Sequence, residues 1–220
     1  MIFENGEYYH IFNQGNNRMP IFYSRENYLF FLDKISKHIL PYADVIAWCL
    51  MPNHFHLMLY VRGIGSTRKT TSIISVDTLI GSATKTSSVS SSNTPNNDLN
   101  KSIGILLASY TRAINQQEKR TGSLFRVHTH AECLTKCYGI TPSFINTPTG
   151  MRIIQRVPEE EYPQVCFNYI HLNPVKAGLV KKPQAWEFSS YADYCGERNG
   201  KLINRKRAEE FGLSITDNPY

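Results

Sequence analysis

Residues 43–62, ADVIAWCLMPNHFHLMLYVR, combine two apolar runs rich in β-branched and aromatic side chains, with a Pro-Asn pair between them. Runs of this kind, separated by so short a turn signal, predict two strands that form a β-hairpin. The second run carries His54 and His56 on either side of Phe55. Because alternate side chains of a strand point to the same face, both imidazoles would share one face, opposite Phe55. An apolar strand with two imidazoles on one face suggests a binding function.

The elements around this hairpin follow from the same kind of signals. Ser24 is a good N-cap for a helix, and Tyr110 lies on the apolar face of another predicted helix, where we interpret it as a core residue. The full set is a strand at 7–14, a helix at 24–40, the hairpin, a helix at 102–121, a strand at 123–134, and a helix from Pro158 that Pro174 would end. This order predicts an α+β fold, a ferredoxin-like two-layer domain with an antiparallel sheet and helices on one face.

The domain organisation is interrupted by one stretch of different composition. Residues 63–100 are mostly Ser, Thr and Asn with few large apolar groups, which is typical of a mobile insertion that buries little surface. We therefore expect one domain over residues 1–196 that carries this insertion, followed by a basic C-terminal tail over 197–220.

The overall composition restricts the class of protein. The 220 residues carry a formal net charge of +6, which favours an anionic partner. Five cysteines, an odd number, argue against a disulfide framework and favour a reducing compartment. The N-terminus shows no signal-peptide pattern, and no uncharged apolar run is long enough to span a bilayer. We expect a cytoplasmic protein without a membrane partner.

A second pair of polar residues would complement the two histidines. Tyr169 and Asn173, in YIHLN, are four residues apart, so a helix would place them side by side. Asn173 could add an oxygen ligand to a metal ion held by His54 and His56, and Tyr169 would then face whatever that ion binds. Taken alone, each pair is better explained without a site: His54 and His56 as incidental surface or edge-strand histidines, Tyr169 and Asn173 by packing and helix capping.

A further group of possible ligands lies in HTHAECLTKC. Two histidines and two cysteines are able to form a tetrahedral zinc site, but a single strand does not easily bring all four side chains to one ion, and the spacing is not that of a familiar zinc finger. A zinc-stabilised interaction domain remains an alternative that uses His128, His130, Cys133 and Cys137.

Several blocks of the sequence resemble a known family. LMPNHFHLML (50–59), YIHLNPVKAGLV (169–180) and WEFSSYADYCG (186–196) are similar to the signature blocks of HUH single-tyrosine transposases, and most of all to those of REP-associated tyrosine transposases. YHIFNQGNNRMPIF (9–22), with YLFFL (28–32), resembles the first strand, loop and helix of that group. The blocks occur in family order, and their combination is far more specific than any one of them.

The resemblance implies a ferredoxin-like, usually dimeric enzyme that acts on single-stranded DNA with hairpins. By motif, His54 and His56 would bind Mg²⁺ or Mn²⁺, Asn173 would be the third ligand, and Tyr169 would be the nucleophile that forms a 5′-phosphotyrosine and frees a 3′-hydroxyl. Strand rejoining would then need no ATP. A domesticated protein that binds or nicks genomic repeats without transposition is the second functional hypothesis.

DNA contacts should come from scattered polar and basic side chains and from aromatic rings that stack on bases. The sequence departs from the family pattern after TGSLF, where RVHTHAECL replaces the expected basic residues, and TPSFINTPTG resembles an insertion. These departures concern DNA specificity rather than the catalytic set. The candidate DNA-binding residues are Asn16, Arg18, Arg112, Lys119, Arg120, Arg126 and Lys176.

Overall fold

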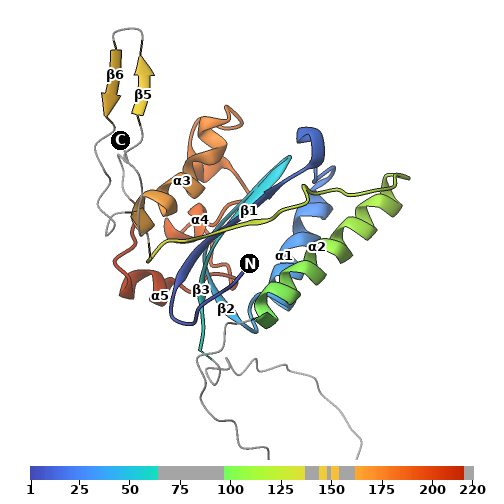
Figure 1. Cartoon of the computed structure of the whole chain (residues 1–220), viewed down its shortest axis with the longest axis horizontal. Coiled ribbons are helices and arrows are strands. Elements are labelled where there is room, and N and C mark those ends of the chain that lie inside the picture. The colour runs from blue at the N-terminus through green and yellow to red at the C-terminus, as the bar shows by residue number, and fades with distance from the viewer. Residues whose placement is uncertain (64–96, 137–143, 148–149, 154–161, 216–220) are drawn as a thin grey trace, which may run out of the picture.

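The computed structural model describes residues 1–63, 97–136, 144–147, 150–153 and 162–215 (Figure 1). Its main unit runs in the order β-α-β-β-α-β. The elements are β1 (Tyr8–Gln14), α1 (Arg25–His38), β2 (Ala43–Met51), β3 (His54–Val61), α2 (Asn97–Gln117) and β4 (His130–Cys133). Helix α2 begins inside the range expected for the insertion, and residues 64–96 lie outside the described residues.

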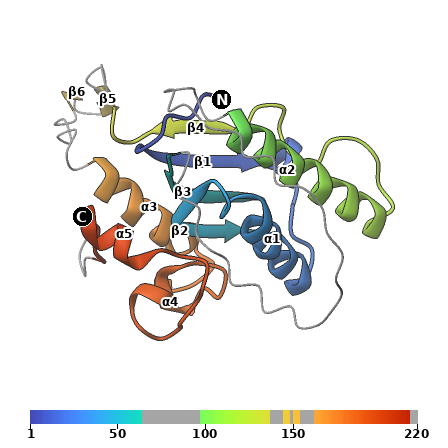
Figure 2. The same cartoon turned by 90° about the horizontal axis from the view of Figure 1, so that it is seen from below.

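The four strands form one antiparallel sheet in the order β2-β3-β1-β4. Figure 2 shows this order with β4 at one edge and β2 at the other. Each of the helices α1 and α2 therefore connects strands that are not neighbours in the sheet, which is the ferredoxin-like arrangement. The α+β fold class predicted from the sequence is confirmed.

Local sequence signals account for the ends of the first helix and of the hairpin. Ser24 is the N-cap of α1, and its backbone N–H donates to Oδ1 of Asn27 at 3.2 Å. The turn between β2 and β3 is Pro52–Asn53, and the carbonyl oxygens of both residues accept hydrogen bonds from the segment after β1, such as Gly15 N–H to Asn53 O at 2.8 Å. The hairpin turn is therefore held to the end of β1.

The sheet has two differently covered faces. Helices α1 and α2 cover one face, over a core that includes Phe31, Phe55 and Tyr110. The other face packs against α3 (Tyr162–Lys176) and α5 (Arg205–Glu210), with a core that includes Met58 and Phe167. The expectation of helices on one face therefore holds for α1 and α2 only, because α3 brings its own apolar side chains to the opposite face.

Two predictions about the C-terminal part need adjustment. Helix α3 continues through Pro174 and ends two residues later, at Lys176, so the proline lies in the last turn instead of ending the helix before it. The expected start at Pro158 lies outside the described residues. Part of the segment separated as a basic tail packs on the domain: Ala208 and Leu213 are buried against the sheet, and Asn204 N–H donates to Val45 O at 2.8 Å.

The remaining described elements are short. They are the 3₁₀ helices η1 (Asn16–Arg18) and η2 (Pro183–Ala185), the helix α4 (Tyr191–Tyr194), and the strands β5 (Phe144–Thr147) and β6 (Gly150–Ile153), which pair with each other. Among the described residues no helix is both long and apolar enough to cross a membrane.

Candidate active site

The two histidines of β3 lie on the face of the sheet that α3 partly covers. Their neighbour Phe55 packs into the core under α1 and α2, so the alternation expected from the sequence is observed. The His54 and His56 ring centroids are 5.0 Å apart, with the ring planes at 87°. His56 is buried at 5% exposure, and His54 is half-buried.

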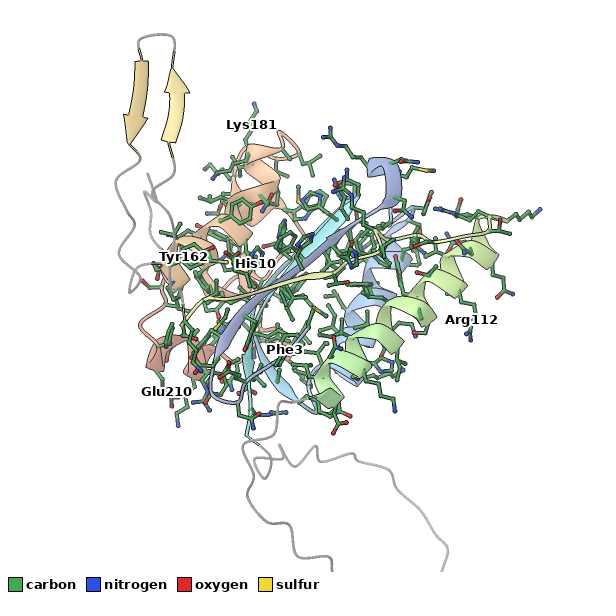
Figure 3. All side chains as sticks on the ribbon, in the orientation of Figure 1. Phe3, His10, Arg112, Tyr162, Lys181 and Glu210 are labelled. Atoms are coloured by element: carbon green, nitrogen blue, oxygen red, sulfur yellow. The ribbon has the colours of Figure 1, made fainter. Side chains whose placement is uncertain are left out.

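A third histidine, His10 of β1, belongs to the same group and was not predicted from the sequence. Its Nε2 is 2.9 Å from Nδ1 of His56, and the ring is buried. In Figure 3 His10 lies on the side of the sheet that faces α3. A signal was available in YYHIF, because Tyr9 and Ile11 point into the core, which places His10 and Phe12 on the opposite face. What the sequence did not show is that β1 pairs directly with β3.

The hydrogen bonds around His54 fix which ring nitrogen is available. Asn53 donates from Nδ2 to the carbonyl oxygen of Arg18 at 3.2 Å, which turns its Oδ1 toward His54. That Oδ1 lies 2.6 Å from Nδ1 of His54. An amide oxygen only accepts, so Nδ1 of His54 carries the proton. In the neutral ring the lone pair is then on Nε2, the nitrogen that could bind a metal ion in place of its hydrogen bond with Asn173.

The same reasoning applies to His56. Its Nε2 is buried and has no hydrogen-bond partner among the described residues. If His56 donates from Nδ1 to Nε2 of His10, Nε2 of His56 keeps its lone pair. A buried polar atom without a partner costs about 1–3 kcal/mol. We therefore expect a bound ligand to supply the missing partner of Nε2 of His56.

Helix α3 brings Tyr169 and Asn173 to these histidines. The ring of Tyr169 lies 5.3 Å from that of His56 and 6.2 Å from that of His10, edge-on to both. Asn173 donates from Nδ2 to the carbonyl oxygen of Tyr169 at 3.2 Å, and its side chain also hydrogen-bonds to His54. Tyr169 is 36% exposed, so its ring is accessible to a substrate.

His54, His56 and Tyr169 line a pocket of about 200 Å³. The wall includes both histidines of β3 and Tyr169, and it extends along the ends of β1 and β4. The lining residues are Phe12, Asn13, Gln14, His54, His56, Arg126, His130 and Tyr169.

The histidines of the site are held in their neutral form. Burial lowers the pKa of His10 to about 4. Burial also lowers the pKa of His56 well below its ordinary value, with smaller contributions from His10 and His54. The pKa of His54 is lowered by burial and partly raised again by the hydrogen bond with Asn173. Neutral imidazoles at pH 7 have the lone pair that metal ligation requires.

The donor set fits a divalent cation with open coordination positions. His54 and His56 present nitrogen lone pairs, and the Asn173 amide adds an oxygen. Within the described residues, no group of three or more His, Cys, Asp or Glu side chains is arranged to hold a metal ion. Substrate oxygens or water would therefore complete the coordination sphere.

The predicted DNA-binding residues divide into three groups. Arg126 lines the pocket, and Nζ of Lys176 is 5.5 Å from the centroid of the Tyr169 ring. Asn16 and Arg18 lie in the segment after β1 that is tied to the hairpin turn beside His54. The others lie on or directly after α2, which covers the opposite face of the sheet. They are Arg112, labelled in Figure 3, Lys119 and Arg120.

Two other candidates from the sequence were Tyr110 and the possible zinc ligands. Tyr110 is fully buried and donates from its hydroxyl to Ile21 O at 2.8 Å, so its prediction as a core residue is confirmed. Of the zinc candidates, His130 lines the pocket, whereas Cys133 packs toward the core under α1 and α2. His130 and Cys133 are three residues apart on a strand, so their side chains point to opposite faces of the sheet. Cys137 lies outside the described residues.

Comparisons with known proteins add little to this geometry. No family model matches the sequence, and no curated protein matches it. A solved structure that matches is that of a REP-associated tyrosine transposase bound to a REP hairpin. It shares 14% sequence identity over 93% of this chain and 91% of the other, with a TM-score of 0.49. Similarity of that degree carries no argument about activity, which has to come from the residues of the site.

Proposed function

We propose that this protein is a metal-dependent transposase or nickase of single-stranded DNA that uses Tyr169 as its nucleophile. The observation that carries the proposal is the convergence of Tyr169 with His54 and His56 at one pocket, with Asn173 hydrogen-bonded to His54 behind it. The motif resemblance to single-tyrosine transposases and the net charge of +6 support the same substrate class.

In the proposed reaction, the phenol oxygen of Tyr169 attacks a backbone phosphorus, and its proton passes to water. A Tyr Oη–P bond forms while the P–O3′ bond breaks, and the leaving 3′ oxygen takes up a proton from water. The products are a 5′-phosphotyrosine and a 3′-hydroxyl. In the reverse step a 3′-hydroxyl attacks the phosphotyrosine and restores a phosphodiester. One phosphodiester is exchanged for another, so rejoining needs no ATP.

The residues of the chain prepare this reaction. Asn53 and His10 orient the two ligand imidazoles, and burial keeps those imidazoles neutral. A bound divalent cation would polarise the phosphate and stabilise the leaving 3′ oxygen. The positive charge of Lys176 beside the Tyr169 ring favours both a phosphate and a developing phenolate.

The resemblance also supports finer proposals about the substrate and the assembly. We expect a DNA hairpin next to the cleaved strand and a homodimeric enzyme. Size-exclusion chromatography with light scattering measures the second expectation directly, and a monomer at all concentrations would contradict it.

The decisive experiment is a denaturing gel of the protein with labelled hairpin-bearing oligonucleotides, with Mn²⁺ or with EDTA. Wild type should give a protein–DNA adduct that requires metal, and Tyr169→Phe should give none while it still binds DNA. Tyr162→Phe is a matched control, because Tyr162 lies on the same helix but its hydroxyl donates to Glu132 at 2.7 Å. An adduct from Tyr169→Phe equal to that of wild type would refute the assignment.

The same assay separates the two candidate cations. Imidazole ligands suit Mn²⁺ better than Mg²⁺, which prefers carboxylate and water oxygens, and no carboxylate lines the pocket among the described residues. Half-maximal adduct should therefore need a lower concentration of Mn²⁺ than of Mg²⁺. Equal requirements would indicate that the imidazoles do not ligate the ion.

A further inference from the structure

The pocket has an aromatic wall that the proposed reaction does not use. Phe12 of β1 and His130 of β4 lie directly opposite each other in the sheet. Their ring centroids are 4.9 Å apart, and their planes are almost parallel at 9°. Both rings line the pocket that contains Tyr169.

The position of this pair makes it accessible. Strand β4 is the edge of the sheet, and His130 is exposed while Phe12 is half-buried. The Phe12 ring is 5.8 Å from the His56 ring, which in turn is 5.3 Å from the Tyr169 ring. The stacked pair is therefore separated from the nucleophile by a single side chain.

A positively charged side chain lies at the same wall. Arg126 lines the pocket, and its backbone is fixed to β1 by two hydrogen bonds: its N–H donates to Gln14 O at 2.9 Å, and its carbonyl oxygen accepts from Asn13 Nδ2 at 3.2 Å. The wall thus combines flat aromatic surface with a guanidinium on a fixed backbone. Proteins that hold single-stranded nucleic acids combine these features, because each base offers a π-face and each linkage a phosphate.

We propose that Phe12 and His130 form a stacking platform for one unpaired nucleobase next to the scissile phosphate, with Arg126 on the adjoining phosphate. This inference rests on the proposed function for its substrate class, and it assigns a role to residues that the reaction leaves unused. The platform fixes the nucleotide beside Tyr169 and therefore sets which phosphate reaches the nucleophile.

The test measures binding rather than cleavage. In a Tyr169→Phe background with EDTA, fluorescence anisotropy would give the affinity for a single-stranded oligonucleotide, and 2-aminopurine placed on either side of the cleavage site would report stacking. His130→Ala should weaken binding by roughly five- to a hundredfold and abolish the quenching at one of the two positions. His130→Tyr, which keeps a flat ring, should retain most of both signals.

Two controls make the result specific. His128 is exposed two residues earlier but does not line the pocket, so His128→Ala should bind like the parent. Replacement of the stacked nucleotide by an abasic residue should weaken parent binding, yet add little in His130→Ala, because both changes remove the same contact. Phe12→Leu should behave like His130→Ala if it folds.

The outcomes distinguish this inference from the proposed function. Independent, additive effects of the abasic residue and of His130→Ala would overturn the platform, even if the Tyr169 adduct forms as expected. Coupled effects without any adduct from the wild type would support the platform and overturn the transposase reaction. A parent protein that binds no single-stranded DNA would overturn both.

Discussion

The two faces of the sheet are built from the same strands but serve different purposes. On one face, α1 and α2 close over Phe31, Phe55 and Phe125. On the other, α3 packs chiefly against β2 and only lightly against β3, so the pocket lies over β1, β4 and the start of β3. Figure 2 shows α3 on the β2 side of this face.

One polar atom on each face illustrates the contrast, although Trp48 Nε1 on the closed face is also buried without a partner among the described residues. The closed face contains the Tyr110 hydroxyl, which donates to Ile21 O. The partly covered face contains Nε2 of His56, which is buried without a partner among the described residues. An unpaired buried polar atom reduces stability, and natural proteins tolerate such costs mainly where activity requires them. Because the unpaired Nε2 of His56 lies on the face that carries the pocket, we interpret this face as shaped for binding and the closed face as mainly stabilising the fold.

The largest effect expected on the closed face is that of Phe31→Ala. Phe31 is fully buried, so its loss should lower the free energy of unfolding by about 3–5 kcal/mol. Phe30→Ala is the matched control: Phe30 is 37% exposed, so its loss should cost on the order of 1 kcal/mol. Urea unfolding measures both. Mn²⁺ affinity of folded Phe31→Ala should equal that of wild type; a tenfold loss would show that the two faces are not independent.

A smaller effect is expected from His10 on the other face. His10→Leu removes the acceptor that holds the His56 ring and should weaken Mn²⁺ binding by roughly 10- to 100-fold, as is typical when a partner of a metal ligand is lost. His10→Gln offers a carbonyl oxygen to Nδ1 of His56 and should recover much of the affinity. Titration of free Mn²⁺ by electron paramagnetic resonance measures this without DNA or catalysis. Equal affinities for all three proteins would mean that His10 only fills space.

Local signals in the sequence were sufficient to predict the hairpin and the two residue pairs of the site. Strand alternation placed His54 and His56 on one face, and helical spacing placed Tyr169 beside Asn173. These predictions depend on the geometry of a single element, and for that reason sequence reasoning reaches them.

Other features depend on which elements become neighbours. His10 joins His56 only because β1 pairs with β3, and His130 stacks on Phe12 only because β4 pairs with β1. No periodicity in one segment encodes such pairing. The packing of Ala208 against the sheet was missed for the same reason, because the basic residues around it suggested a solvated tail.

The last expected effect is a pH dependence of stability caused by a histidine outside the site. His171 of α3 is buried, and its Nε2 is 2.8 Å from Oγ of Ser190, which in turn accepts from Trp48 N–H at 2.9 Å. This network attaches α3 to β2 away from the pocket. Burial lowers the pKa of His171 to about 3, although the charge of Asp193 opposes this shift.

The sign of the effect follows from proton binding. Above pH 6.5, His171 is neutral in both states; below it, the unfolded chain binds a proton that the folded protein excludes until the pH approaches 3. Stability should therefore fall with decreasing pH, by about 1.4 kcal/mol per pH unit for this residue.

His171→Gln should reduce the slope of unfolding free energy between pH 6 and pH 4 by about that amount, as measured by urea titrations. His128→Gln, at an exposed position, should leave the slope unchanged. An unaltered slope in His171→Gln would show that His171 accepts its proton without unfolding, and that the attachment of α3 is looser than the hydrogen bonds indicate.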